Sequence, residues 1–320
     1  MTLQNKCISI GDATLEFIPI HDENQLKDAS EYRREASGVA ALVSAAVATL
    51  GAKSFLVGKT GDDAFGCFLI DTLKSYGVDV DYLLQTSKAN TSVSFTTSDK
   101  KEAIFYKQPS ADMLLRSEDI NASWFEKGDV LFYSSMPLIQ NTSRAAVETA
   151  INAAVKKGCI VTFAPRLSKQ HWLNETITRE TVLHFIPHSH ILILNEDELQ
   201  FLTGKTDEYA AVKQLFAGKA KLLIIKRGNR GLTYVTRRER GHVDYLLEKV
   251  NPLGAGEEAF IGSLIYECLY KEMTPDTLNT ILYDRIVLED LLLKALTSKC
   301  IVSKEKGKLS ALKVLKGLVK

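Results

Sequence analysis

Short apolar runs alternate with longer helical segments along most of the chain. Runs typical of buried strands occur at 7–10, 54–57, 160–163, 191–194 and 222–225, with a weaker one at 78–83. Segments with the spacing or length of helices occur at 39–50, 63–76, 143–157 and 196–203. Strands that alternate with helices predict an α/β fold, with a parallel sheet covered on both faces.

One part of the chain breaks this alternation. Residues 91–97 and 103–106 are strand-like and flank the polar turn 98–101, which predicts a β-hairpin. Residues 14–20 form another strand-like run, and the polar segment 21–35 after it is predicted to be a loop. Together these runs predict a small sheet beside the main one.

Length and composition exclude several classes of protein. The 320 residues, 45% of them hydrophobic, are enough for a sizeable core. Forty basic residues balance 39 acidic ones, so no net charge favours a nucleic-acid partner. Five dispersed cysteines, with no signal peptide and no bilayer-spanning run, predict a cytoplasmic protein without a membrane partner. The lysine-rich segment 304–320 is interpreted as a solvated terminal face, with a partner-binding helix as the alternative.

The most informative stretch is a glycine turn followed by two acids. Gly254, Ala255 and Gly256 precede Glu257 and Glu258, and an apolar helical pattern follows. Backbone N–H groups at such a helix start form an anion site. An acid beside them could accept the proton of a hydroxyl that attacks a bound phosphate. The alternative is an ordinary turn before a core helix with two surface acids, and this stretch alone does not decide between them.

This stretch resembles the D-T-x-G-A-G-D-x-F signature of the ribokinase-like (PfkB-type) sugar kinases, whose last Asp is the catalytic base. Asn251 and Pro252 stand at the first two positions of the signature, and the pair Glu257–Glu258 replaces the single Asp. Further segments resemble family motifs in the family's order. They are the first signature at 51–66, a fructokinase-type segment at 109–113, the N-x-x-E motif at 194–204 and the nucleotide loop at 225–231.

The resemblance implies a ribokinase-like three-layer sandwich with a mainly parallel central sheet and a small β-sheet lid. It implies one domain over residues 1–320, with lid segments at about 12–35 and 90–108. It also implies ATP-dependent phosphoryl transfer to a sugar hydroxyl with Mg²⁺, no nucleic-acid partner, and a possible homodimer through the lid. The substrate-binding candidates are Glu16, Gly38 and Arg166.

The resemblance assigns the remaining site residues as well. Glu257 or Glu258 would be the base, and Gly254, Ala255 and Gly256 would form the anion hole. Asn195, Lys226, Gly228 and Gly231 would bind the nucleotide, and Glu198 would support Mg²⁺ indirectly, because this ion keeps several waters. The residues alone favour a different interpretation of Asn195 and Glu198, as a helix N-cap and a first-turn acid.

The sugar-facing positions depart from the family pattern. Leu42 replaces a sugar-binding Asn and cannot form a side-chain hydrogen bond. Glu16 stands for a shorter Asp, and Arg166 stands where the family has Asn in D-P-N-x-R. Two hypotheses follow. One is a fructokinase-like kinase, impaired or with an altered substrate, and the other is a catalytically inactive pseudokinase that acts through nucleotide or protein binding.

Overall fold

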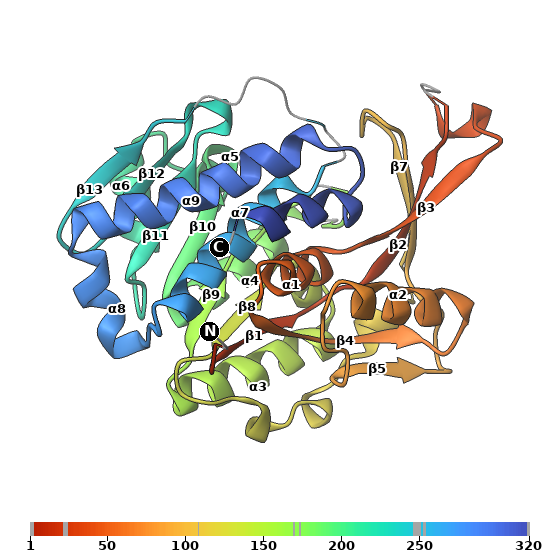
Figure 1. Ribbon diagram of the computed structural model, residues 1–320, viewed down its shortest axis with the longest axis horizontal. Coiled ribbons are helices and arrows are strands. Elements are labelled where there is room, and N and C mark those ends of the chain that lie inside the picture. The colour runs from red at the N-terminus through yellow and green to blue at the C-terminus, as the bar shows by residue number, and fades with distance from the viewer. Residues whose placement is uncertain are drawn as a thin grey trace.

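The central feature of the computed structural model is a long, mostly parallel sheet (Figure 1). The structure describes residues 3–21, 25–107, 109–168, 170–172, 174–245, 251 and 254–318, so Pro252 lies outside the described residues. The strand order is β13-β12-β11-β10-β9-β8-β1-β4-β5, parallel from β5 to β11, with β12 and β13 antiparallel. The strands are β1 (Lys6–Ile10), β4 (Lys53–Gly61), β5 (Leu83–Thr86), β8 (Val130–Tyr133), β9 (Ile160–Phe163), β10 (Ile191–Asn195), β11 (Leu222–Lys226), β12 (Leu232–Val235) and β13 (Arg240–Val243).

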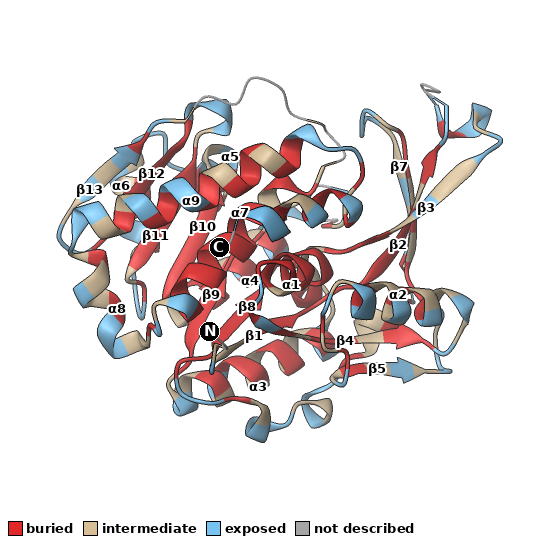
Figure 2. Ribbon diagram, in the orientation of Figure 1, coloured by how far each residue is buried: buried red, intermediate tan, exposed pale blue. Residues whose placement is uncertain are grey.

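Helices cover both faces of this sheet, as the alternating pattern predicts. Side chains alternate between the faces along each strand. Phe132 and Ile224 therefore belong to one hydrophobic core, and their neighbours Leu131 and Leu223 to the other. The first core contains α1 (Val39–Thr49), α2 (Ala64–Ser75), α7 (Gly256–Tyr270), α8 (Pro275–Leu282) and α9 (Arg285–Lys304). The second contains α3 (Asn141–Lys157), α4 (Glu175–Phe185), α5 (Glu196–Thr203) and α6 (Glu208–Leu215). Figure 2 shows the central strands β8, β9 and β11 as buried, whereas the edge strands β5 and β13 carry exposed residues.

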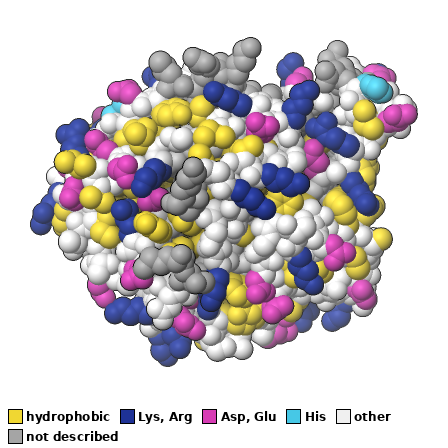
Figure 3. Space-filling model, in the orientation of Figure 1, with side chains coloured by type: hydrophobic (Ala, Val, Ile, Leu, Met, Phe, Trp, Pro, Cys, Tyr) yellow, Lys and Arg dark blue, Asp and Glu magenta, His cyan; other side chains and the backbone are white. Residues whose placement is uncertain are grey.

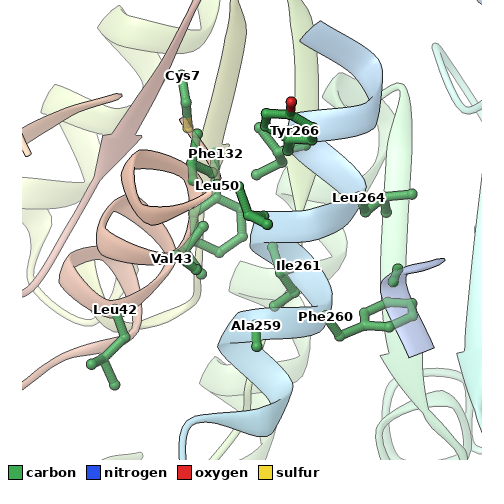
Figure 4. Packing of buried hydrophobic residues seen from close by; sticks show 14 of the residues in the cluster. Cys7, Leu42, Val43, Leu50, Phe132, Ala259, Phe260, Ile261, Leu264 and Tyr266 are labelled. Carbon is green, nitrogen blue, oxygen red and sulfur yellow. The ribbon is translucent and has the colours of Figure 1, made fainter. Parts of the chain in front are cut away.

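Two helices of the first core, α1 and α7, pack very closely (Figure 4). A Cβ atom at Gly262 of α7 would come within 2.5 Å of the Ala46 Cβ of α1, so a larger residue there would push the helices apart. Val43 and Ile261 lie in the same core. This close approach brings the N-terminal ends of both helices to one cavity.

A second, small sheet lies beside the main one, to the right in Figure 1. Its order is β3-β2-β6-β7, and only the β2–β6 pair is parallel. The strands are β2 (Thr14–Pro19), β3 (Tyr32–Ser37), β6 (Val93–Thr96) and β7 (Ala103–Tyr106). The predicted hairpin is thereby confirmed.

Two predictions about local structure were wrong. The segment predicted as a loop at 21–35 includes the start of β3, whose polar residues pair with β2 through the backbone. Its pattern shows no alternation because residues 32–35 are half-buried or exposed and three of the four are charged. Within the weak strand predicted at 78–83, Asp79 forms a single parallel bridge to Phe55 of β4 and a turn follows at 81–82, so the regular strand that pairs with β4 is β5, at Leu83–Thr86.

The C-terminal segment is packed against the protein, so its interpretation as a solvated face was wrong. It forms a 3-10 helix at Ser310–Gly317, and Leu309, Leu312 and Leu315 are buried in the first core. Lys313 and Lys316 of this helix are exposed, while its leucines cover α1 and α9.

None of the helices in the described part of the chain is long and apolar enough to cross a bilayer. On the face shown in Figure 3, basic and acidic side chains are interspersed, in keeping with the formal charge of +1.

Replacement of Leu312 by Ala tests the packing of this C-terminal segment. We expect the free energy of unfolding to fall by about 2–5 kcal/mol, because the removed atoms leave a cavity in a fully buried site. Urea denaturation followed by circular dichroism measures the change. The matched control is Leu318→Ala, at a leucine that is 41% exposed, for which we expect a change within about 0.5 kcal/mol. Equally small effects for both variants would show that the segment is solvated.

Candidate functional site

A cavity of about 340 Å³ lies where the N-terminal ends of α1 and α7 meet the small sheet. It lies beyond the carboxyl ends of the parallel strands, which is the usual position of ligand sites in open α/β sheets. The predicted substrate-binding residues Glu16, Gly38 and Arg166 all line it, as do Gly254 and other site candidates, Asn195, Glu198 and Glu258. The structure therefore brings together residues that lie more than 240 positions apart in the chain.

Glu258, in the first turn of α7, faces this cavity. The side chain is buried, and its Oε1 accepts a hydrogen bond of 2.8 Å from Nη2 of Arg166. Burial works to lower the pKa of Arg166, but the carboxylates of Glu258, Glu257 and Glu198 outweigh it and raise that pKa. Arg166 thus stays a cation beside the acid.

Glu257 has a different environment, although it is the adjacent residue. Its Oε1 lies 2.7 Å from Nζ of Lys299 in α9, and its Oε2 pairs with Lys226 at the end of β11. Burial works to raise the pKa of Glu257, but the two lysines and Arg166 hold it far below the usual range. Successive residues of a helix point roughly 100° apart, which explains why only one of the two acids faces the cavity.

Two glycines near the cavity stand where a Cβ atom would clash with neighbouring atoms. Gly38 has φ of +108°, and a Cβ atom there would lie 2.4 Å from the backbone oxygen of Asp12. A Cβ atom at Gly256 would lie 2.0 Å from Oγ of Ser303, so Gly256 allows α7 to start against α9. Ala255 is fully buried at the N-cap position. The amide of Gly254 itself donates to the Asn251 oxygen at 3.0 Å. The amides that follow it, at the start of α7, have no partner within the helix.

Asn195 and Glu198 form the N-terminal cap of α5, as their residue types predict. The Asn195 Oδ1 accepts from the Glu198 amide at 2.7 Å, and the Glu198 Oε2 accepts from the Asn195 amide at 2.9 Å. The other Glu198 oxygen accepts from the amide of Leu167 at 2.8 Å, which holds the loop that carries Arg166. Within the described ranges no group of three His, Cys, Asp or Glu side chains is placed to hold a metal ion.

The predicted nucleotide loop lies on the other side of the α7 N-terminus. Gly228 and Gly231 adopt positive φ angles of 63° and 95° between β11 and β12. Lys226 is buried and reaches this side of α7 through its ion pair with Glu257. A separate hollow of about 440 Å³ adjoins the loop, lined by Glu196, Arg227, Arg230, Thr233, His242, Asp244 and Tyr245. The structure therefore does not bring Lys226, Gly228 or Gly231 into the first cavity.

Several cavity residues were not predicted from the sequence. Lys308, beyond α9, pairs with Glu16 and lies 2.9 Å from Oγ of Ser37. Burial works to raise the pKa of Glu16, but Lys308 outweighs it and lowers that pKa. The other unpredicted charged residues are Asp12, Lys100 and Lys107. The residue before Lys308 is Gly307, which has a φ of +88°. This glycine was the sequence signal of a turn there.

Comparisons with known proteins agree with this geometry. Residues 4–277 match the model of the pfkB family carbohydrate kinases. The chain is 32% identical over 289 residues to a probable fructokinase-4 of Arabidopsis thaliana, covering 88% of this chain and 84% of that protein. It is 32% identical over 266 residues to a fructokinase-2 of Oryza sativa subsp. japonica, covering 82% and 79%.

Solved structures confirm the predicted fold. A fructokinase from Xylella fastidiosa with bound ATP matches with a TM-score of 0.87 and 24% identity over 98% of both chains. A fructokinase from Vibrio cholerae O395, in a form with fructose, ADP and calcium ion, matches with a TM-score of 0.85 and 24% identity over 99% of both chains. The three-layer arrangement with a small additional sheet is therefore the ribokinase-like one.

Replacement of Lys308 by Met tests the ion pair that joins the C-terminal segment to β2. We expect the free energy of unfolding to fall by about 3–5 kcal/mol at pH 7, because the buried Glu16 carboxylate loses its partner. Chemical denaturation measures the loss. The control, Lys306→Met, changes an exposed lysine two residues away and should alter stability by no more than about 0.5 kcal/mol.

The effect should also depend on pH. Glu16 has a lowered pKa in the folded protein, so its stabilising contribution is full above the ordinary Glu value of about 4.3 and is lost as the pH falls through the lowered pKa. The difference between the wild type and Lys308→Met should therefore shrink below about pH 4. A difference that is constant with pH would contradict the pairing.

Proposed function

Because the chain belongs to the pfkB family of carbohydrate kinases, we propose that it catalyses ATP-dependent phosphoryl transfer to a hydroxyl group of a sugar-like acceptor. The observation that carries this proposal is the position of Glu258. This acid lines the cavity, in the first turn of a helix that starts at a glycine turn, together with Glu16 and Gly38. The proposed base and acceptor residues would thus lie in one cavity, beside the proposed anion site at Gly254.

Glu258 is the proposed general base. A hydroxyl group bound beside it would lose its proton as its oxygen attacks the terminal phosphorus of ATP. The amides at the start of α7 and the Arg166 guanidinium would hold the charge of the transferred group, which is the main requirement of phosphoryl transfer. Glu257, held between Lys226 and Lys299, serves to join α7 to β11 and α9.

The acceptor site favours an altered substrate over fructose itself. Leu42, which lines the cavity, offers no hydrogen bond where the family pattern has Asn. Hydroxyl partners come instead from Thr14, Ser94 and Thr96, which also line the cavity. A site whose hydrogen-bonding groups have changed discriminates against the original substrate.

The nucleotide would lie between the 228–231 loop and the start of α7, with its phosphates toward Gly254. The fructokinase from Xylella fastidiosa holds ATP and the one from Vibrio cholerae O395 holds ADP, which supports a nucleotide for this chain. Asn195 and Glu198 line the cavity, but both Glu198 oxygens accept backbone amides. They would therefore support Mg²⁺ only through its bound waters, which this ion retains readily.

One observation favours the pseudokinase alternative. Nη2 of Arg166 donates a hydrogen bond of 2.8 Å to Oε1 of Glu258, the carboxylate that would have to accept the proton. If this pair never opens, the protein would bind ligands without turnover and act through nucleotide or protein binding. Turnover assays separate the two functions.

The small sheet also supports a proposed homodimer. Its edge strand β7 carries Ile104 and Tyr106, which are 43% and 63% exposed. Exposed apolar side chains on an open strand edge are suited to pairing with a second copy. A cytoplasmic location stays a prediction.

Replacement of Glu258 by Gln tests the proposed base. We expect kcat to fall by about 10²–10⁴-fold, because Gln fills the same space but cannot accept the proton. Stability should also fall, because Arg166 loses its charged partner. ADP release over a panel of sugars and sugar derivatives measures kcat, and calorimetry measures the ATP affinity of each variant.

The neighbouring change Glu257→Gln provides the comparison. It should lower the melting temperature more than Glu258→Gln does, because two buried lysines lose their partner, and it should lower kcat less. The reverse order of the two effects on kcat would make Glu257 the base. ATP binding with no turnover on any acceptor would support the pseudokinase instead.

A further inference from the structure

Unsatisfied polar atoms gather in the cavity. Buried polar atoms in folded proteins nearly always have a hydrogen-bond partner. Asp12 Oδ1, Arg166 Nε and His171 Nδ1 are buried and have none among the described residues, and all three residues line the cavity. Asp12 Oδ1 can accept a hydrogen bond, Arg166 Nε–H can donate one, and His171 Nδ1 can do either according to its tautomer. A ligand in the cavity would supply these partners.

Most of the charges in the cavity are already matched. Lys308 pairs with Glu16, and Arg166 pairs with Glu258. The ammonium group of Lys107 lies between two carboxylates, 3.8 Å from Asp12 and 3.7 Å from Asp112. The remaining lining carboxylate, at position 198, is satisfied by two backbone amides.

Lys100 is different, because the structure shows no ion pair for its ammonium group within the described ranges. It lies in the turn between β6 and β7 and lines the mouth of the cavity. Its φ is +59°, a conformation uncommon outside glycine, and its amide donates to the Thr97 oxygen at 2.9 Å. The next residue, Lys101, points to solvent and pairs with Asp99 at 2.9 Å.

Lys100 is an exposed residue, and it lines the same cavity as both ion pairs. Partial burial and the Lys308 ammonium lower the pKa of Lys100, while Glu258 and Glu16 partly offset them. Arg166 is a further cation close enough to contribute. An unpaired ammonium group and an unpaired guanidinium N–H thus face the same space.

We propose that the ligand of this cavity is a polyhydroxy compound that carries an anionic group, a carboxylate or a phosphate. The anionic group binds between Lys100 and Nε of Arg166, and a hydroxyl group donates to Oδ1 of Asp12. The identification of this ligand as the phosphoryl acceptor rests on the proposed kinase function. The cavity volume of about 340 Å³ is at the lower end of small-molecule sites and suits a single monosaccharide derivative.

The charge of the ligand also bears on the base. An anion at Arg166 competes with Glu258 for the guanidinium and so weakens the pair that occupies the base. A neutral sugar has no comparable group and leaves Lys100 and Nε of Arg166 without a partner. Binding of the anionic group to Arg166 therefore also frees the Glu258 carboxylate from its pair with Arg166.

Calorimetry with D-gluconate and D-glucitol tests the proposal directly. These two compounds share a six-carbon polyhydroxy chain, which ends in a carboxylate in D-gluconate and in an alcohol in D-glucitol. D-Fructose 6-phosphate and D-fructose form a second pair, which separates a phosphate from a carboxylate. At matched ionic strength we expect at least one anionic compound to bind about tenfold or more tightly than its neutral partner.

Two lysine variants make the test specific. Lys100→Gln should remove most of that preference, because it should lower the affinity for the anionic compound much more than the affinity for its neutral partner. Lys101→Gln, one residue along the same turn, should keep the wild-type preference. Equal binding within both pairs, no binding of either anionic compound, or equal effects of the two variants would overturn the proposal.

Assays of ADP release run in parallel distinguish a failure of the anionic-ligand proposal from a failure of the proposed kinase function. ADP release with fructose and no preference for anionic compounds would keep the kinase and exclude the anionic acceptor. Anion-selective binding without ADP release would keep the ligand site and exclude the kinase. A Lys100→Gln variant that loses ATP affinity, with no effect on either ligand pair, would assign these cations to the phosphates of the nucleotide and overturn the proposal.

Discussion

The packing of α7 between α1 and α9 is the constraint on which the rest of the site depends. Gly262 lets α7 approach Ala46 of α1, and Gly256 lets it begin against Ser303 of α9. With both contacts in place, the first turn of α7 has one orientation, in which Glu258 faces the cavity. A displacement of about 1 Å at such a position can lower a reaction rate ~10²-fold, so this core packing is also a functional requirement.

Ion pairs join the segments that the helix packing brings together. Lys308 and Glu16 connect the C-terminal segment to the small sheet, and Arg166 and Glu258 connect the loop after β9 to α7. Each pair is largely shielded from water, so the loss of one partner leaves a costly charge. The same residues therefore hold the cavity together and present charge to its ligand. Stability and ligand recognition at this site are coupled for that reason.

Much of the fold could be predicted from the pattern of the chain, and the exceptions have physical reasons. The strands around 191–194 and 222–225 are apolar throughout because helices cover both faces of the sheet. The strand at 32–37 was missed because its polar residues are held by backbone pairing with β2, which leaves no periodic signal. The buried leucines of 309–315 were taken for a solvated face because the lysines between them dominate the pattern.

By itself, the sequence determined the α/β architecture, the family motifs and the set of candidate acids, since these depend on local periodicity and on residue types at short spacing. It left open whether Glu257 or Glu258 is the base. Tertiary structure alone decided which of the two faces the cavity, because Lys226 and Lys299 from two distant elements hold Glu257, while Glu258 lines the cavity. The assignment of Glu258 as the base is our proposal. The pairing of Glu16 with Lys308 across almost the whole chain is equally a product of folding, because charge partners so far apart carry no local pattern.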